Sequence, residues 1–249
     1  TVNTMLRVSE NYYGTQNTKE ILKKFYDYFT DNTLGFIDYD TALLDENLQE
    51  LNIKYLPRRI IDSNVYEVYS PAKGDNGIIE METDILIKAS GILELTSSTI
   101  LNLGQSKKIM VYGTLMIIGE SGKEVVINCI DTEQKWNSII FYAGANSSSV
   151  DGQGEYIQGS IIKYANISHG GESSEPAAIN INGNTLYIEH LSLTDTATRA
   201  LYTSKAVYVK NSFFENIYPT STTGIITAIE GLNIENSQLL SDSANAYGN

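Results

Sequence analysis

The chain has 249 residues, with 30 acidic and 17 basic side chains and a formal net charge of −13 at pH 7. This charge argues against a nucleic-acid partner, because the neutralisation of phosphates requires clustered lysine and arginine. The single cysteine excludes an internal disulfide framework and a cysteine zinc cluster, and no apolar run reaches the length of a membrane span. Because the sequence starts at Thr1 rather than methionine, we expect a mature form, a fragment or one repeat unit.

Residues 1–75 differ from the rest of the chain and are predicted to form a terminal strand followed by an α-helical junction or cap. A short strand is expected over residues 5–8. Apolar side chains then recur at helical spacing after Thr18, whose hydroxyl can accept the free amide hydrogens of a first helical turn. This pattern predicts one amphipathic helix over residues 18–30, and a second short helix is expected over residues 45–51.

Residues 76–249 are predicted to be all-β, because the helical period vanishes and short apolar runs are separated by Gly, Asn, Ser and Asp. Four segments of this region align without gaps: residues 161–167, 187–193, 208–214 and 233–239. Their second position is always Ile or Val, and these positions lie 26, 21 and 25 residues apart. Such a period indicates a solenoid, in which each coil buries its apolar side only against its neighbours. Two loops, residues 144–155 and 169–176, are expected to be insertions at the corners.

The repeat at residues 209–216 and 234–239 resembles the right-handed parallel β-helix, the pectate-lyase-like fold of polysaccharide-degrading enzymes and many microbial surface proteins. Residues 113–141, with Trp136, resemble the opening coils of the non-catalytic surface branch. Residues 11–15 resemble a segment that often ends a β-helix in such proteins, with Tyr in place of its usual Trp. The resemblance implies a right-handed parallel β-helix, a scaffold that carries both enzymes and passive binders.

The two ends of the repeat region predict self-association. The motif expected after a β-helix stands at the N-terminus, and the last repeat has no cap. If copies were joined end to start, Ile234 and the next Val8 would lie 23 residues apart, which falls inside the internal period. Solenoid ends normally carry polar caps, and bare strand edges invite pairing. We therefore predict that copies stack head to tail, or follow one another in a longer chain; a fragment cut from a larger surface protein is the alternative. The apolar residues expected at this contact are Met5, Leu6, Val8, Ile234, Leu239 and Leu240.

Side chains that an enzyme of this fold would need are interpreted as structural. The cations available to a lyase in the clear coils are Arg199, Lys163, Lys205 and Lys210. The carboxylates available to a hydrolase are Asp151, Asp195 and Asp242. We expect the aspartates to be corner residues that bind the turn backbone, and the net charge would repel a polyanionic substrate at long range.

Ligand contacts are predicted at one loop and along one tyrosine stripe. His169 and Glu172 lie on a glycine-containing loop, where an imidazole near carboxylates can bind a ligand or act as a base. Tyr164, Tyr187 and Tyr208 offer flat rings on which sugars stack. No cofactor is expected. Calcium is a minor alternative, because two acidic groups supply hard oxygen ligands: Asp38, Asp40, Asp45 and Glu46, and Glu80, Glu82 and Asp84.

The predicted function is that of a non-catalytic extracellular protein, a structural or adhesive β-helix on a cell surface or in a filament. Its expected partners are further copies of itself and surface glycans, without nucleic acid and without membrane insertion. Two sequons, at Asn146 and Asn166, fit an exported protein. The alternatives are a polysaccharide lyase or hydrolase of the pectate-lyase-like fold and a phage tail or stem component.

Overall fold

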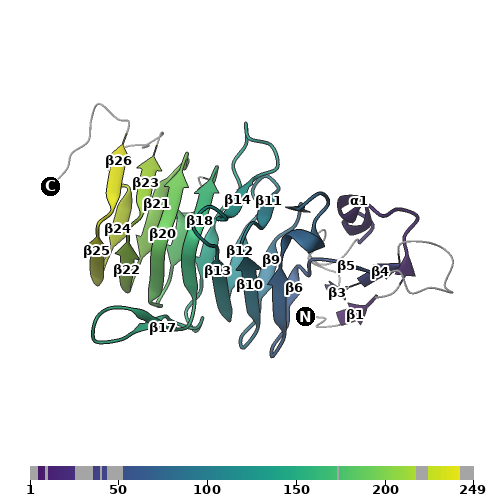
Figure 1. Cartoon of the computed structure of the whole chain (residues 1–249), viewed down its shortest axis with the longest axis horizontal. Helices are drawn as coiled ribbons and strands as arrows, with labels where there is room; N and C mark the ends of the chain where they lie inside the picture. The colour runs from purple at the N-terminus through teal and green to yellow at the C-terminus, as the bar shows by residue number, and fades with distance from the viewer. Residues whose placement is uncertain are drawn as a thin grey trace.

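The chain forms a parallel β-helix of seven coils that follows a small N-terminal cap (Figure 1). The computed structural model describes residues 5–8, 11–25, 36–39, 41–43, 53–172, 174–216 and 224–241. The all-β class and the parallel β-helix predicted from the sequence are confirmed. None of the described helices has the length and hydropathy that a membrane span requires.

Each coil contributes a strand to each of three faces, which we number in chain order. The first face is a seven-stranded parallel sheet made of β6 (Ile60–Ile61), β9 (Ile85–Ile87), β12 (Ile109–Val111), β15 (Ile139–Phe141), β19 (Ala177–Ile181), β21 (Arg199–Thr203) and β24 (Ile226–Ala228). The second face consists of β7 (Tyr66–Tyr69), β10 (Ile92–Thr96), β13 (Thr114–Ile118), β18 (Ile161–Ser168), β20 (Leu186–Thr194), β22 (Ala206–Lys210) and β25 (Gly231–Glu235).

The third face is continuous with the second, because β18 and β20 run through the corner between them. Its other strands are β8 (Ile78–Met81), β11 (Ile100–Leu103), β14 (Val125–Cys129), β23 (Phe213–Asn216) and β26 (Gln238–Ser241). Two insertions leave this scheme: the antiparallel pair β16 (Ser149–Val150) and β17 (Tyr156–Gln158), and a single 3-10 turn, η1 (Pro71–Lys73). The first of them lies in the corner loop predicted at residues 144–155.

The four aligned segments of the sequence stack in the predicted register. Ile162 pairs with Ile188, Ile188 with Val209, and Val209 with Ile234. All these side chains point inward, and the first three are fully buried. Because successive side chains of a strand point to opposite faces, the even spacing within each segment fixes which residues enter the core.

The corner between the second and third faces is a left-handed bend at the fourth position of the repeat. Tyr164, His190, Asn211 and Asn236 all have φ between 48° and 51°. Asparagine tolerates this conformation better than most residues, which explains its recurrence there. His190 therefore occupies a structural position of the repeat, and its ring stacks on Tyr164 with centroids 4.3 Å apart.

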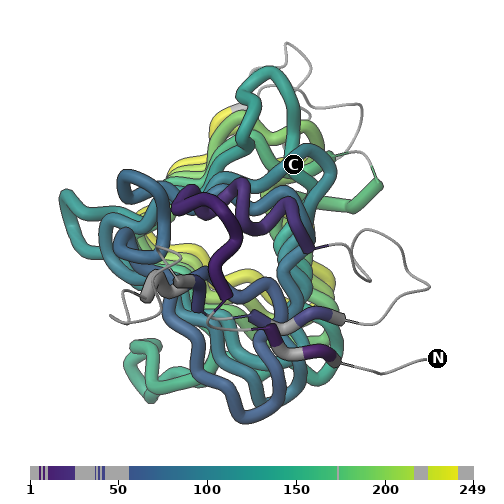
Figure 2. The backbone as a smooth tube through the Cα atoms, turned by 90° about the vertical axis from the view of Figure 1, so that its right-hand side faces the viewer, coloured from purple at the N-terminus to yellow at the C-terminus, as the bar shows by residue number. Residues whose placement is uncertain are grey.

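The cap covers the N-terminal end of the core. Its strands are β1 (Met5–Arg7), β2 (Asn11–Tyr12), β3 (Phe36–Asp38), β4 (Thr41–Leu43) and β5 (Ile53–Tyr55), and its helix is α1 (Thr18–Leu22). In Figure 2, α1 lies across the end of the stacked coils. Ile21 is fully buried in the cap, and Leu22 packs against the core of the β-helix. The amide and hydroxyl of Thr18 donate to the Asp75 carboxylate, at 2.7 and 3.1 Å, which ties the helix to the first coil.

Three expectations for this region differ from the structure. The helix predicted over residues 18–30 ends at Leu22, because Phe25 leaves the helix to stack on Tyr39 at 4.5 Å. Its N-cap is Asn17, whose side chain accepts the Glu20 amide hydrogen, rather than Thr18. The boundary expected at residue 75 falls inside the first coil, which begins at β6. Residues 26–30 and the short helix expected over residues 45–51 lie outside the described residues.

Candidate functional site

The C-terminal coil exposes side chains that every earlier coil buries. Leu232 is 43% exposed, whereas Val207, its partner in the preceding coil, is fully buried. Leu239 is 45% exposed, and its partner Phe214 is fully buried. The apolar columns of the core therefore end on an uncovered surface, which we call the open end: the inward side of β24, β25 and β26.

The backbone of the open end is also available for pairing. Within the described residues, β24 pairs only with β21, β25 only with β22, and β26 only with β23. An edge strand presents a row of free amide and carbonyl groups, which form a template for another strand. Apolar area and strand edges thus coincide on one surface.

The residues predicted for self-association lie in different places. Ile234 and Leu239 belong to the open end, and the register adds Leu232, which the sequence analysis missed. Leu240 faces outward, because it is in register with Glu215 on the outer side of the third face. At the other end of the molecule, Leu6 in β1 is 58% exposed.

Two further members of that predicted set belong to the cap. Val8 packs against the hydrophobic cluster of the cap, so it supports the cap from inside. Met5 pairs in register with Phe36 through β1 and β3; its side chain lies outside the described residues. The strand β1 pairs only with β3 among the described strands, which leaves one of its edges open.

The cations considered for a lyase are engaged in local contacts. Lys163 pairs with Glu189 at 2.8 Å, and Lys205 pairs with Glu230. Lys210 pairs with Glu155 at 2.7 Å and with Glu235 at 3.8 Å. The fourth cation, Arg199, donates from Nη1 to the Pro176 carbonyl at 3.4 Å. These contacts tie neighbouring coils and loops together along the axis.

His169 lies at a corner, where it pairs with an acidic side chain of a neighbouring coil that also binds a lysine. Its Nε2 is 2.8 Å from the Asp195 carboxylate, which also pairs with Lys135 Nζ at 2.8 Å. The expectation that Asp195 binds its own turn backbone is wrong, because both of these partners come from other coils. Among the described residues the Glu172 side chain makes no contact with this cluster, and its amide donates to the Trp136 carbonyl at 3.4 Å.

Two other aspartates were considered with Asp195. Asp151 does bind turn backbone, since its carboxylate accepts the amides of Gln153 and Glu155 at 2.9 and 2.8 Å. This contact closes the loop between β16 and β17. Asp242 lies outside the described residues.

The three predicted tyrosines do not form one flat platform. Tyr187 is 1% exposed, because the β16–β17 insertion covers it and Tyr156 packs on its ring at 5.7 Å. This burial raises the pKa of Tyr187 to about 12. Tyr208 lies in register with Tyr187 and is half-buried, whereas Tyr164 stands at the left-handed bend.

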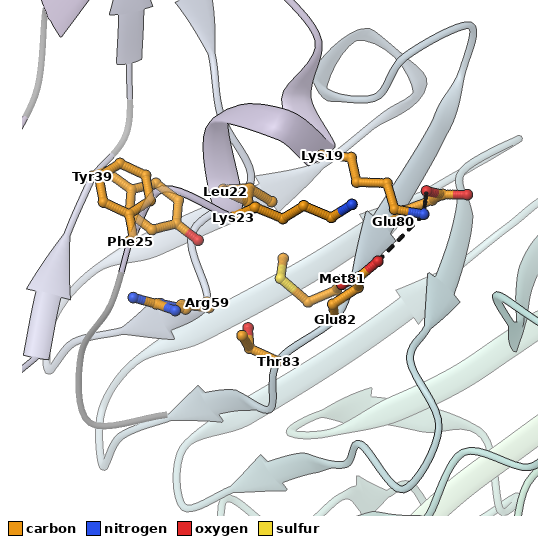
Figure 3. A pocket seen from close by; sticks show the side chains of 10 residues that line it. All are labelled: Lys19, Leu22, Lys23, Phe25, Tyr39, Arg59, Glu80, Met81, Glu82 and Thr83. Carbon is orange, nitrogen blue, oxygen red and sulfur yellow. Dashed lines mark ion pairs between the residues drawn. The ribbon is translucent and has the colours of Figure 1, made fainter. Parts of the chain in front are cut away.

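A cavity of about 190 Å³ lies at the seam between the cap and the first coil (Figure 3). Leu22 and Phe25 of the cap and Met81 of β8 provide its apolar wall. Along its rim, Lys19 pairs with Glu80 at 2.7 Å and with Glu82 at 3.3 Å, as the dashed lines in Figure 3 mark. The charged residues at this seam therefore fasten α1 to the third face.

Described carboxylates of the second acidic group considered for calcium are engaged in contacts within the protein. Glu80 and Glu82 bind Lys19, and the Asp84 carboxylate accepts the Lys108 amide at 3.0 Å. Asp40, Asp45 and Glu46 lie outside the described residues, as does the side chain of Asp38. Across the described ranges, no three His, Cys, Asp or Glu side chains are arranged to hold a metal ion.

Stability is expected to fall as the pH rises above the ordinary carboxyl range of about 4, because burial raises the pKa of Glu67 and of Asp84. A raised pKa in the folded state means that protonation favours folding, so this contribution is present at low pH and is lost as the pH rises through the folded pKa. Thermal unfolding followed across this range should show a falling Tm. The slope should flatten in the Glu67→Gln/Asp84→Asn variant; an unchanged slope would contradict the assignment.

Comparison with known proteins does not assign the chain to a family. No family model, curated protein sequence or solved structure matches the chain.

Proposed function

We propose that the chain is a non-catalytic extracellular structural or adhesive β-helix protein that stacks head to tail on another coil of the same kind. A second copy, or an adjoining repeat of a longer chain, supplies that coil. The observation that carries this proposal is the exposure of Leu232 and Leu239 at positions that the preceding coils bury completely. Each coil of a solenoid completes its core only against a neighbour, so the open end calls for one more coil.

Both ends of the molecule offer strand edges to a stack. The C-terminal end offers the edges of β24, β25 and β26. The N-terminal end offers the edge of β1 that is not paired with another described strand, together with the exposed Leu6. Head-to-tail contacts of this kind do not close, so they generate a filament rather than a fixed small oligomer. The corner insertion at β16 and β17 lies along the side of such a rod, where its outer surface can contact surface glycans or other partners (Figure 1).

The test compares two variants of the last coil that add the same charge. Ile234→Asp/Leu239→Asp places carboxylates on the open end, and Asn233→Asp/Gln238→Asp places them on the exposed outer side of the same strands. We expect the wild type to form end-to-end assemblies in sedimentation velocity and negative-stain microscopy. The inward variant should remain monomeric, because two charges would be buried without partners, and the outward variant should assemble like the wild type.

Two results would overturn the proposal. A wild type that stays monomeric at several hundred micromolar would show that copies do not stack. Assembly of the inward variant at the wild-type concentration would show that any stacking uses another surface. Circular dichroism of both variants should show the β-sheet signal of the wild type. Both pairs of substitutions lie in the last coil, which packs against only one other coil, so the rest of the β-helix should stay folded.

A further inference from the structure

Three ladders of side chains reach the open end, the serine ladder through the last two coils and the other two through more. The first is a ladder of serines beside the left-handed bend. Ser212 Oγ accepts the Leu191 amide hydrogen of the preceding coil at 3.1 Å and donates to the Lys210 carbonyl of its own coil at 2.7 Å. Ser237 repeats this arrangement one coil later, accepting from the Ser212 amide at 3.0 Å and donating to the Glu235 carbonyl at 2.9 Å.

The serine ladder has a direction, since each hydroxyl satisfies an amide of the coil before it. The next amide in the series belongs to Ser237. Within the described part of the chain no acceptor is placed for this amide in the way that Ser237 serves Ser212. A further coil would complete the ladder by placing a serine at the position that follows its bend.

The second ladder is a column of alternating charge on the outer side of the second face. Lys163, Glu189, Lys210 and Glu235 stand in register in four successive coils. Opposite charges on neighbouring strands stabilise their pairing, and like charges directly opposite destabilise it. The column ends at Glu235, whose side chain is 58% exposed, so a cation belongs at the next position.

The third ladder is apolar. The column through Ile188, Val209 and Ile234 requires an aliphatic residue immediately before the cation. The column through Leu193, Phe214 and Leu239 requires a large apolar residue two positions after the serine. Between the cation and the serine stands the left-handed bend, which favours asparagine.

Resting on the proposed function, we infer that the open end is a strand-addition site for a parallel strand–bend–strand segment that reads aliphatic–cation–asparagine–serine–any residue–large apolar. Main-chain hydrogen bonds to an exposed sheet edge give such sites their affinity, and side-chain positions give them specificity. The chain contains one segment that meets every requirement, Val209-Lys210-Asn211-Ser212-Phe213-Phe214 in the sixth coil. The folded chain holds this segment between its fifth and seventh coils, so the repeat that fills the open end comes from outside the folded copy.

The probe is a fluorescein-labelled synthetic peptide with the sequence of residues 206–216, titrated with the full-length protein and followed by fluorescence anisotropy. We expect saturable binding to the wild type. The Ile234→Asp/Leu239→Asp protein should lose it, and the Asn233→Asp/Gln238→Asp protein should keep it. A peptide with Ser212→Ala should bind about fivefold more weakly, because the Ser237 amide then lacks its acceptor.

The charge ladder gives the sharpest comparison. A peptide with Lys210→Glu should bind the wild type about fivefold more weakly than the unaltered peptide. The Glu235→Lys protein should reverse this preference and bind the Lys210→Glu peptide more tightly. Absence of peptide binding, or a preference that the Glu235→Lys exchange leaves unchanged, would overturn the inference.

The outcome is separable from that of the proposed function. If the peptide binds with the expected charge preference while the wild type stays monomeric, the recognition site stands and stacking of whole copies fails. If the wild type forms filaments while the peptide and its variants are not distinguished, stacking stands and the recognition sequence is wrong.

Discussion

Gly113→Ala is expected to destabilise the β-helix by about 3–5 kcal/mol, the largest effect of any single methyl group that we predict for this chain. A Cβ at this position would lie 2.2 Å from the Gly91 carbonyl oxygen and 2.4 Å from that of Lys88. Both oxygens belong to the backbone of the preceding coil, and both accept hydrogen bonds there, from the Thr114 and Gly91 amides at 2.9 Å. The Gly91 oxygen cannot move away without breaking its hydrogen bond to the third coil, and the Lys88 oxygen cannot move without breaking the turn within the second coil.

Gly152→Ala is the matched control for this substitution. A Cβ at residue 152 would have no atom within 4 Å, and its backbone φ is not in the left-handed region. We expect its free energy of unfolding to stay within about 0.5 kcal/mol of the wild type. Urea unfolding monitored by circular dichroism measures both variants, and a Gly113→Ala protein as stable as the control would show that the coils can separate at this corner.

Trp136→Ala is expected to cost about 3–5 kcal/mol, since truncation of a buried tryptophan leaves a large cavity. Trp136 is fully buried in the core, and its Nε1 donates to the Ser168 carbonyl at 2.7 Å. Its ring also fills the space beside Gly170, where a Cβ would approach it to 2.6 Å. For a chain of this size the loss corresponds to a fall in Tm of about 10 °C.

Two further variants test this prediction: one keeps part of the side-chain volume of Trp136 but removes its hydrogen bond, and the other is an exposed control. Trp136→Phe keeps most of the ring but removes the donor to Ser168, and we expect a cost of about 1–3 kcal/mol. Ile157→Ala removes a side chain that is 57% exposed, so its unfolding free energy should change by less than about 0.5 kcal/mol. If Trp136→Ala unfolds with the same Tm as Ile157→Ala, the tryptophan does not belong to the cooperative core.

The register of the coils could be predicted from the sequence because it follows from a local pattern of apolar residues. The second and seventh positions of each repeat point into the core, and the alignment of Ile162, Ile188, Val209 and Ile234 follows from that alternation alone. The serine that closes the ladder also recurs in the sequence, at Ser212 and Ser237. The pattern does not show which residue of each hydrogen bond donates and which accepts, because that depends on how far one coil is shifted relative to the next.

The sequence by itself determined the fold class, the period and the inward residues, because a stacked solenoid buries the same positions in every coil. Only the tertiary structure decided what covers the outside. Tyr187 is a strand residue with an outward ring, and it is buried solely because the β16–β17 insertion folds back over it. His169 and Lys135 both pair with Asp195 because three coils bring their corners together, although the residues are far apart in the chain. The length of α1 was likewise decided by packing, since the contact of Phe25 with Tyr39 outweighs the helical period of the sequence.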